Sequence, residues 1–139
     1  MTDAFDADVL IYAAVAGHPL GRRVRALFES APGDRFAGAG STLLLPELLT
    51  KPLRDGAHSE ILELGALLGR LDLRPVDEAT ARLAASLGAS YRLKAADAVH
   101  LATAVSIGAT RFITNNRKDF AADISEVDIT YPDDLPSPH

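Results

Sequence analysis

Two aspartates, Asp6 and Asp8, stand where a short apolar strand is expected to give way to a helix. Ala4 and Phe5 precede the pair, and residues 9–16 form an apolar, alanine-rich run. Because Asp is a good helix N-cap, capping explains this spacing as well as chemistry does. The two carboxylates acquire a functional meaning only if other reactive side chains converge on the same junction.

Two further carboxylates lie inside or beside apolar runs. Glu47 is flanked by leucines within residues 43–49, and Asp97 directly precedes the apolar residues 98–105. A buried carboxylate is costly unless it is paired or bound to a metal ion, so both are candidate site residues. The alternative for Glu47 is a place on the solvent face of a helix. His100 shares the helical face of Asp97, and we interpret it as a hydrogen-bonded packing residue rather than a ligand.

A polar segment follows the strand predicted for residues 111–114. Thr114 ends this strand, and Asn116 and Asp119 lie in the loop beyond it. In open α/β sheets, ligands bind at the carboxyl ends of the strands. Thr114, Asn116 and Asp119 are therefore candidates for the same crevice as Asp6.

Short strands alternate with helices along the chain, which predicts an α/β fold with a short, mostly parallel central sheet flanked by helices. Strands are expected at residues 4–5, 35–40, 71–76, 111–114 and 127–130, and helices at 9–16, 20–29, 59–71, 77–91 and 97–108. Pro46 predicts a kink or a later helix start, and Pro52 predicts an interruption. We expect one domain over residues 1–131 and a flexible, proline-rich tail over residues 132–139.

Composition excludes several classes of protein. The 139 residues carry a net charge of −5 and no cysteine, so disulfides, thiolate nucleophiles and cysteine zinc sites are absent. The acidic balance argues against a generally cationic surface that coats nucleic acid. No phosphate-binding glycine loop and no serine-hydrolase G-x-S-x-G pattern is present. With no signal-peptide pattern and no apolar run near the roughly 20 residues that span a bilayer, we expect a cytoplasmic protein without a membrane partner.

Convergence of Asp6, Glu47 and Asp97 would require a cation. Two like charges about 4 Å apart repel by about 4 kcal/mol at an effective dielectric constant near 20. Clustered carboxylates therefore need protons or cations, and divalent cations are the better answer at neutral pH. Mg²⁺ and Mn²⁺ prefer oxygen ligands and leave coordination positions for a substrate phosphate.

Taken together, the motifs resemble those of the PIN-domain ribonucleases, and most closely the VapC-type toxins of bacterial toxin–antitoxin pairs. The resemblance covers roughly residues 4–130 in order, spacing and length. The matching segments are Phe5 to Ile11, Leu45 to Leu49, Ala96 to Ala104 and Phe112 to Phe120. Each segment is weak evidence alone, and the four together are fairly specific.

The resemblance implies that Asp6, Glu47 and Asp97 bind Mg²⁺ or Mn²⁺ for hydrolysis of RNA phosphodiester bonds by an endoribonuclease. Asp8 stands where the family commonly has Ser, Thr or Asn, which gives it a helix-capping role or a role as an additional ligand. Because Glu47 and Asp97 share this task with Asp6, we expect Asp6 to be the metal ligand and Asp8 to cap the helix or to support the ligands.

The late segment departs from the family pattern. Asn116 falls where many members carry a fourth acid, so the number of metal ions, one or two, stays open. Asp119 either substitutes for that acid or caps the turn before Phe120, while Thr114 orients ligands or a phosphate through its hydroxyl group.

The resemblance also implies partners. RNA is the substrate, a small antitoxin is the cognate protein partner, and a homodimer is the expected assembly. Basic side chains near the acids in sequence are candidates for steering RNA phosphates, with ordinary surface charge as the alternative. These residues are Arg92, Lys94, Arg117 and Lys118.

Two other functions compete with this interpretation. A PIN-like module that binds RNA or protein with weak or no catalysis is favoured by Asn116. A haloacid-dehalogenase-like phosphatase also uses two Asp residues after its first strand, but Val9 and Leu10 do not fit the residues that follow in that family. The late adjacent acids that such a phosphatase needs occur only as Asp133 and Asp134, in the proline-rich tail.

Overall fold

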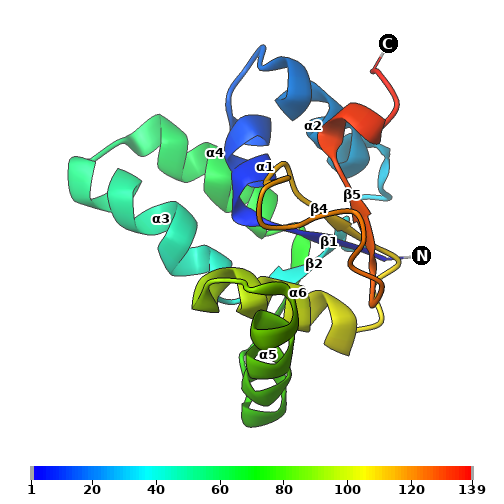
Figure 1. Cartoon of the computed structure of the whole chain (residues 1–139). Helices are drawn as coiled ribbons and strands as arrows, with labels where there is room; N and C mark the ends of the chain where they lie inside the picture. The colour runs from blue at the N-terminus through cyan, green and yellow to red at the C-terminus, as the bar shows by residue number, and fades with distance from the viewer. Residues whose placement is uncertain (1, 139) are drawn as a thin grey trace.

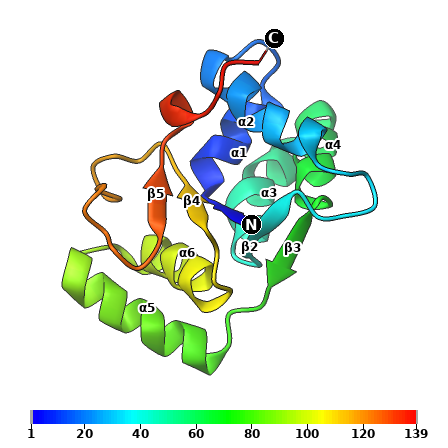
Figure 2. The same cartoon turned by 90° about the vertical axis from the view of Figure 1, so that its right-hand side faces the viewer.

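A single parallel sheet forms the centre of the computed structural model, which describes residues 2–138 (Figure 1). Within those residues the sheet has five strands in the order β3-β2-β1-β4-β5, and every pairing is parallel. The strands are β1 Asp3–Phe5, β2 Gly38–Ser41, β3 Leu71–Arg74, β4 Arg111–Ile113 and β5 Asp128–Thr130. The predicted α/β fold with a short parallel sheet is confirmed, and β3 and β5 form its two edges (Figure 2).

Helices cover both faces of the sheet. The helices are α1 Ala7–Ala14, α2 Pro19–Ser30, α3 Leu44–Asp55, α4 His58–Leu68, α5 Glu78–Tyr91 and α6 Ala95–Ser106, and a 3-10 helix, η1, spans Pro132–Asp134. The pair α5 and α6 covers one face, at the bottom of Figure 1, and α1 to α4 gather around the other. No helix within residues 2–138 is long and apolar enough to cross a membrane.

Alternating side chains of the central strands divide the core into two layers. Ala4 and Phe112 pack with α5 and α6, whereas Phe5 and Ile113 pack with the helices of the opposite face. Because both faces are covered, β1 and β4 are apolar on both sides, as buried parallel strands usually are. The parallel arrangement also places the ends of β1 and β4 at the same edge, which is where Asp6 and Thr114 follow them.

The two prolines of α3 have different consequences. The helix begins at Leu44, two residues before Pro46, because a proline in the first turn lacks only an N–H that has no partner within the helix. The predicted interruption at Pro52 is wrong: α3 continues to Asp55 and ends at Gly56, whose φ is 63°. A missing backbone donor in the last turn therefore did not end this helix.

The C-terminal segment packs on the body of the protein. After η1, Leu135 is buried in the core beside α2, and Arg23 donates hydrogen bonds to the carbonyl groups of Asp133 (3.1 Å) and Leu135 (2.7 Å). This packing differs from the flexible tail expected from residue 132 onward, because one apolar side chain and one arginine hold the segment in place. Met1 and His139, at the ends of the predicted domain and tail, lie outside the described residues.

Candidate functional site

Asp6 lies at the junction of β1 and α1, with only 5% of its surface exposed. Its Oδ1 accepts a hydrogen bond from the backbone N–H of Ala7 (2.8 Å), which makes it the N-cap of α1. Its Oδ2 accepts a hydrogen bond from Oγ1 of Thr114 (2.8 Å). Burial raises the pKa of the Asp6 carboxyl group, and the Thr114 hydrogen bond opposes that rise. The side chain is therefore held in one place at the carboxyl edge of the sheet.

Thr114 is fully buried directly after β4. Its Oγ1 accepts a hydrogen bond from the backbone N–H of Asn116 (3.1 Å) and uses its single proton to bond Asp6. Its own N–H donates to the carbonyl group of Thr130 on β5 (3.1 Å). The loop after β4 and strand β5 therefore hold Thr114 in place, and the hydroxyl group of Thr114 orients Asp6.

Asp8 lies in the first turn of α1, beside Asp6. Its Oδ1 accepts from the N–H of Val9 (2.8 Å), and its Oδ2 accepts from the N–H of Asn115 (3.0 Å) in the loop after β4. Burial, followed by repulsion from Asp6, raises the pKa of the Asp8 carboxyl group to about 6. Asp8 is therefore part of the acidic cluster and also ties the loop after β4 to the first turn of α1. A role of Asp8 beside the metal ligands stays a prediction.

Asp97 projects from the first turn of α6 toward the same cluster. Partial burial raises the pKa of its carboxyl group, and repulsion from Asp6 and Asp119 raises it further. Over residues 2–138, no Lys or Arg forms an ion pair with Asp6, Asp8 or Asp97. The cluster thus concentrates negative charge without a basic side chain to balance it.

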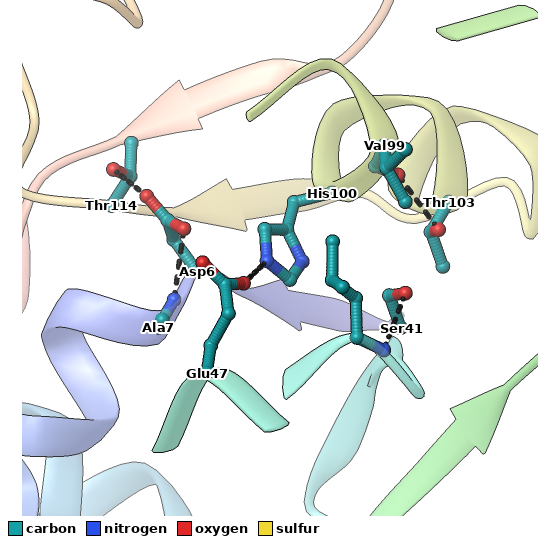
Figure 3. A network of polar contacts seen from close by, with 9 residues as sticks. Asp6, Ala7, Ser41, Glu47, Val99, His100, Thr103 and Thr114 are labelled. Carbon is teal, nitrogen blue, oxygen red and sulfur yellow. Dashed lines mark hydrogen bonds and ion pairs between the residues drawn. The ribbon is translucent and has the colours of Figure 1, made fainter. Parts of the chain in front are cut away.

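Glu47 reaches the cluster from α3 and is bonded to a histidine. One of its carboxylate oxygens contacts Nε2 of His100 on α6, and the carboxylate lies next to that of Asp6 (Figure 3). His100 is the buried, hydrogen-bonded residue that the sequence predicted, but its pairing with Glu47 was missed. Its spacing of three residues from Asp97, on one helical face, was the signal that could have found it.

Asn116 and Asp119 bond each other rather than standing free. Nδ2 of Asn116 donates to Oδ2 of Asp119 (2.9 Å), and the N–H of Asp119 donates to Oδ1 of Asn116 (3.2 Å). This reciprocal pair closes the turn that carries Phe120 into the core. Asn116 therefore caps the turn, whereas the carboxylate of Asp119 accepts a hydrogen bond from the Asn116 amide. The charge of Asp119 also acts on Asp97.

The basic candidates divide into two kinds. Arg117 stacks on the ring of Tyr131, 4.0 Å from the ring centre, and pairs with Asp133 (2.9 Å). Arg92, Lys94 and Lys118 are exposed. Arg117 consequently anchors the loop after β4 to the C-terminal segment, while the other three cations face solvent.

The chemistry of the donors fits a hard divalent cation. Carboxylate oxygens predominate, and Asp6, Asp8 and Asp97 all have raised pKa values that a cation would counter. In the arrangement seen here, no three His, Asp or Glu side chains of residues 2–138 form a complete set of metal ligands. Mg²⁺ does not need such a set, because one or two carboxylates with water and substrate phosphates suffice.

Comparisons with known proteins identify the family of the chain. The sequence pattern of the PIN domain matches residues 4–124. A toxin–antitoxin complex from Klebsiella pneumoniae contains a chain with 26% identity and a TM-score of 0.72, with 95% of this chain and 98% of that chain covered. VapBC2 from Rickettsia felis, solved with a DNA fragment from its promoter, gives 18% identity and a TM-score of 0.73, with 94% and 98% covered.

A third structure shows the same fold. VapBC-1 from nontypeable Haemophilus influenzae has 18% identity and a TM-score of 0.69, with 96% of this chain and 99% of that chain covered. No curated protein sequence matches the chain. The domain match covers most of the chain, and the resemblance inferred from the four motifs is confirmed. The chain therefore belongs to the PIN domain family.

Proposed function

We propose that this protein is a divalent-metal-dependent endoribonuclease and the toxin of a toxin–antitoxin pair. PIN domains are nuclease domains, so hydrolysis of phosphodiester bonds follows from the family. The observation that carries the proposal is the charge of the site. Buried Asp6 lies beside Asp8 and Asp97, all three have raised pKa values, and none forms an ion pair with a Lys or Arg among the described residues. Such a cluster repels RNA phosphate until a cation neutralises it.

Asp6, Asp97 and Glu47 would hold Mg²⁺ or Mn²⁺, which supplies an activated water and stabilises the departing oxygen. The protein contributes rigid placement of the carboxylates. Thr114 and the N-terminus of α1 fix Asp6 before substrate arrives, so little reorganisation is needed during the reaction. The raised pKa values mean that cation binding releases protons from the cluster, which makes binding pH-dependent.

Exposed cations supply the contacts to the RNA backbone. Arg92 is the C-cap of α5 and Lys94 the N-cap of α6, so both stand within five residues of Asp97. Lys118 lies in the loop between Asn116 and Asp119. Their charges would position phosphates beside the acids, while the sequence preference for RNA depends on contacts with unpaired bases.

An antitoxin is the protein partner that we propose, with a homodimer as the assembly. The structures similar to this chain include a toxin–antitoxin complex and two VapBC assemblies. The similarity extends over more than nine-tenths of both chains in each case, which supports a toxin of the same size. Co-expression with the product of a neighbouring small gene should relieve growth inhibition.

Incubation of the purified protein with structured RNA, with Mg²⁺, with Mn²⁺ and after removal of metal, tests the proposal. Cleavage should require the metal, and Asp97→Asn should abolish it while the protein stays folded. Asp123→Asn removes the same charge from an exposed position and serves as the matched control. Cleavage that continues unchanged after complete removal of metal would overturn the mechanism.

The non-catalytic PIN-like module is the second candidate, and the Asn116–Asp119 pair favours it. A neutral amide occupies the position of the fourth acid and also engages one oxygen of Asp119. RNA binding without cleavage, in either metal, would support this candidate. The phosphatase alternative has lost its support, because the chain is a PIN domain and Asp133 pairs with Arg117.

A further inference from the structure

A single contact holds the side chain of Glu47 in the site. It lies in the first turn of α3 and its side chain is 34% exposed, so solvent is within its reach. Holding a free glutamate in one conformation costs side-chain entropy. The contact with Nε2 of His100 is the only hydrogen bond of this carboxylate among the described residues.

His100 is placed to constrain Glu47 because its own side chain is buried and surrounded by packed residues. Its side chain is 1% exposed, and it lies on α6 between Val99 and Leu101, in a helix packed against the sheet. Figure 3 shows the ring on the side of Glu47 that faces α6, with the other carboxylate oxygen turned toward Asp6. One helix thus supplies Asp97 directly and fixes Glu47 through His100.

The carboxylate of Glu47 determines which way the hydrogen bond runs. A carboxylate has only acceptor oxygens, so the imidazole proton of this contact lies on Nε2, which donates it to Glu47. Nδ1 of His100 is buried without a partner within residues 2–138, so no second hydrogen bond directs the ring elsewhere. A nitrogen that carries this proton cannot coordinate a metal ion, so Nε2 of His100 is not a ligand.

We propose that His100 is a positioning residue that holds Glu47 in the acidic site beside Asp6. The inference rests on the proposed function, because it gives Glu47 a cation to bind. Groups that orient metal ligands typically contribute 10- to 100-fold to metal affinity or activity. Without the imidazole donor, the Glu47 side chain turns into solvent and the site loses one carboxylate.

Two substitutions separate the hydrogen bond from the shape of the ring. His100→Leu removes the donor, and His100→Gln keeps an amide donor near the position of Nε2. His58→Gln, at an exposed histidine at the start of α4, is the matched control. For each variant, Mn²⁺ affinity is measured by calorimetry, RNA cleavage as kcat and KM, and folding as the melting temperature.

We expect His100→Leu to weaken Mn²⁺ binding and kcat about 10- to 100-fold, with KM for RNA little changed. His100→Gln should recover most of the loss, and His58→Gln should match the unmodified protein. In a Glu47→Ala background, His100→Leu should have little further effect, because the two residues act through one contact. Unchanged Mn²⁺ affinity in His100→Leu, or a full additional loss in the Glu47→Ala background, would overturn the inference.

A measurement without metal or RNA separates this inference from the proposed function. Nitrogen-15 NMR of the imidazole in the metal-free protein should show a protonated Nε2 and an unprotonated Nδ1, and Glu47→Ala should perturb the Nε2 signal. An Nε2 that carries no proton overturns the inference even if RNA is cleaved. Failure of the unmodified protein to bind Mn²⁺ and cleave RNA overturns the proposed function instead, and with it the role of the contact in metal binding.

Discussion

The hydroxyl group of Thr114 donates a 2.8 Å hydrogen bond to Oδ2 of Asp6, a residue 108 positions earlier in the chain. Both side chains are buried, and the bond crosses from the end of β4 to the end of β1. The bond holds Asp6, the most buried acid of the site, through a hydroxyl group that the N–H of Asn116 fixes in turn. The accuracy of the site therefore depends on a residue that need not touch the substrate.

Thr114→Val should lower RNA cleavage and Mn²⁺ affinity about 10- to 100-fold, because Asp6 loses the donor that orients it. Valine has nearly the shape of threonine, so the fold should survive with a modest loss of stability. Thr114→Ser retains the hydroxyl group and should keep most of the activity. Equal activity of the valine and serine variants would show that the hydrogen bond does not matter for catalysis.

Protonation of Asp8 should make the metal-free protein more stable as the pH falls from about 7.5 to about 5. The pKa of Asp8 is about 6 in the folded protein and 3.8 ordinarily, so the folded state binds this proton more tightly than the unfolded state. The stabilisation is complete below the ordinary value and is lost as the pH rises through about 6. A rise of the pKa from 3.8 to about 6 corresponds to a total stability change of about 3 kcal/mol.

Melting temperatures of the metal-free protein across that pH range measure the effect. Asp8→Asn should flatten the pH dependence and raise the melting temperature near neutral pH, because the repelling charge is gone. Saturating Mg²⁺ should flatten it in the unmodified protein as well, since the cation replaces the proton. A melting temperature that falls steadily as acid is added would contradict the role assigned to Asp8.

Leu135→Ala should destabilise the protein by about 2 kcal/mol and lower its melting temperature by about 5–10 °C. The side chain is buried in the core beside α2, and its truncation leaves a cavity. Leu62→Ala is the control, because Leu62 on α4 is 73% exposed. If both variants melt at the temperature of the unmodified protein, the C-terminal segment does not contribute to the fold.

Arg117→Ala and Lys118→Ala should have different effects although the residues are adjacent. Arg117 stacks on Tyr131 and pairs with Asp133, so its loss should lower stability by about 1 kcal/mol. Lys118 is exposed, so its loss should leave the melting temperature unchanged and raise KM for RNA. The slope of affinity against salt concentration should also become shallower for Lys118→Ala. Indistinguishable melting curves for the two variants would show that Arg117 is not an anchor.

Local patterns predicted much of the fold. Asp77 caps α5 by accepting a hydrogen bond from the N–H of Thr80 (2.8 Å), at the start of the helix that was predicted for residues 77–91. The alternation of short strands with helices predicted the parallel sheet, because parallel strands need long connections. The predicted interruption at Pro52 was wrong. The sequence around a proline does not show whether a helix continues despite the loss of one backbone hydrogen bond, as α3 does.

The site was predictable in its residue types but not in its contacts. Asp6 and Asp97 stand out as acids at strand and helix ends, and the structure places both in one cluster. The Glu47–His100 pair joins residues 53 positions apart, so the sequence around either residue does not predict that the two are bonded. Asp8 was given a lesser role because capping explained it fully at the level of the sequence. Its coupling to Asp97 depends on how α6 packs.

The central position of β1 has a consequence for the synthesis of the protein. β1 leaves the ribosome well before β4, its neighbour in the sheet, and Asp6 receives its hydrogen bond from Thr114. A nascent chain that stops before residue 111 has neither β4 nor the loop that closes the acidic site. If the protein acts as proposed, its nuclease activity cannot begin until residues 111–119 have been synthesised, and a message broken before their codons yields a harmless product.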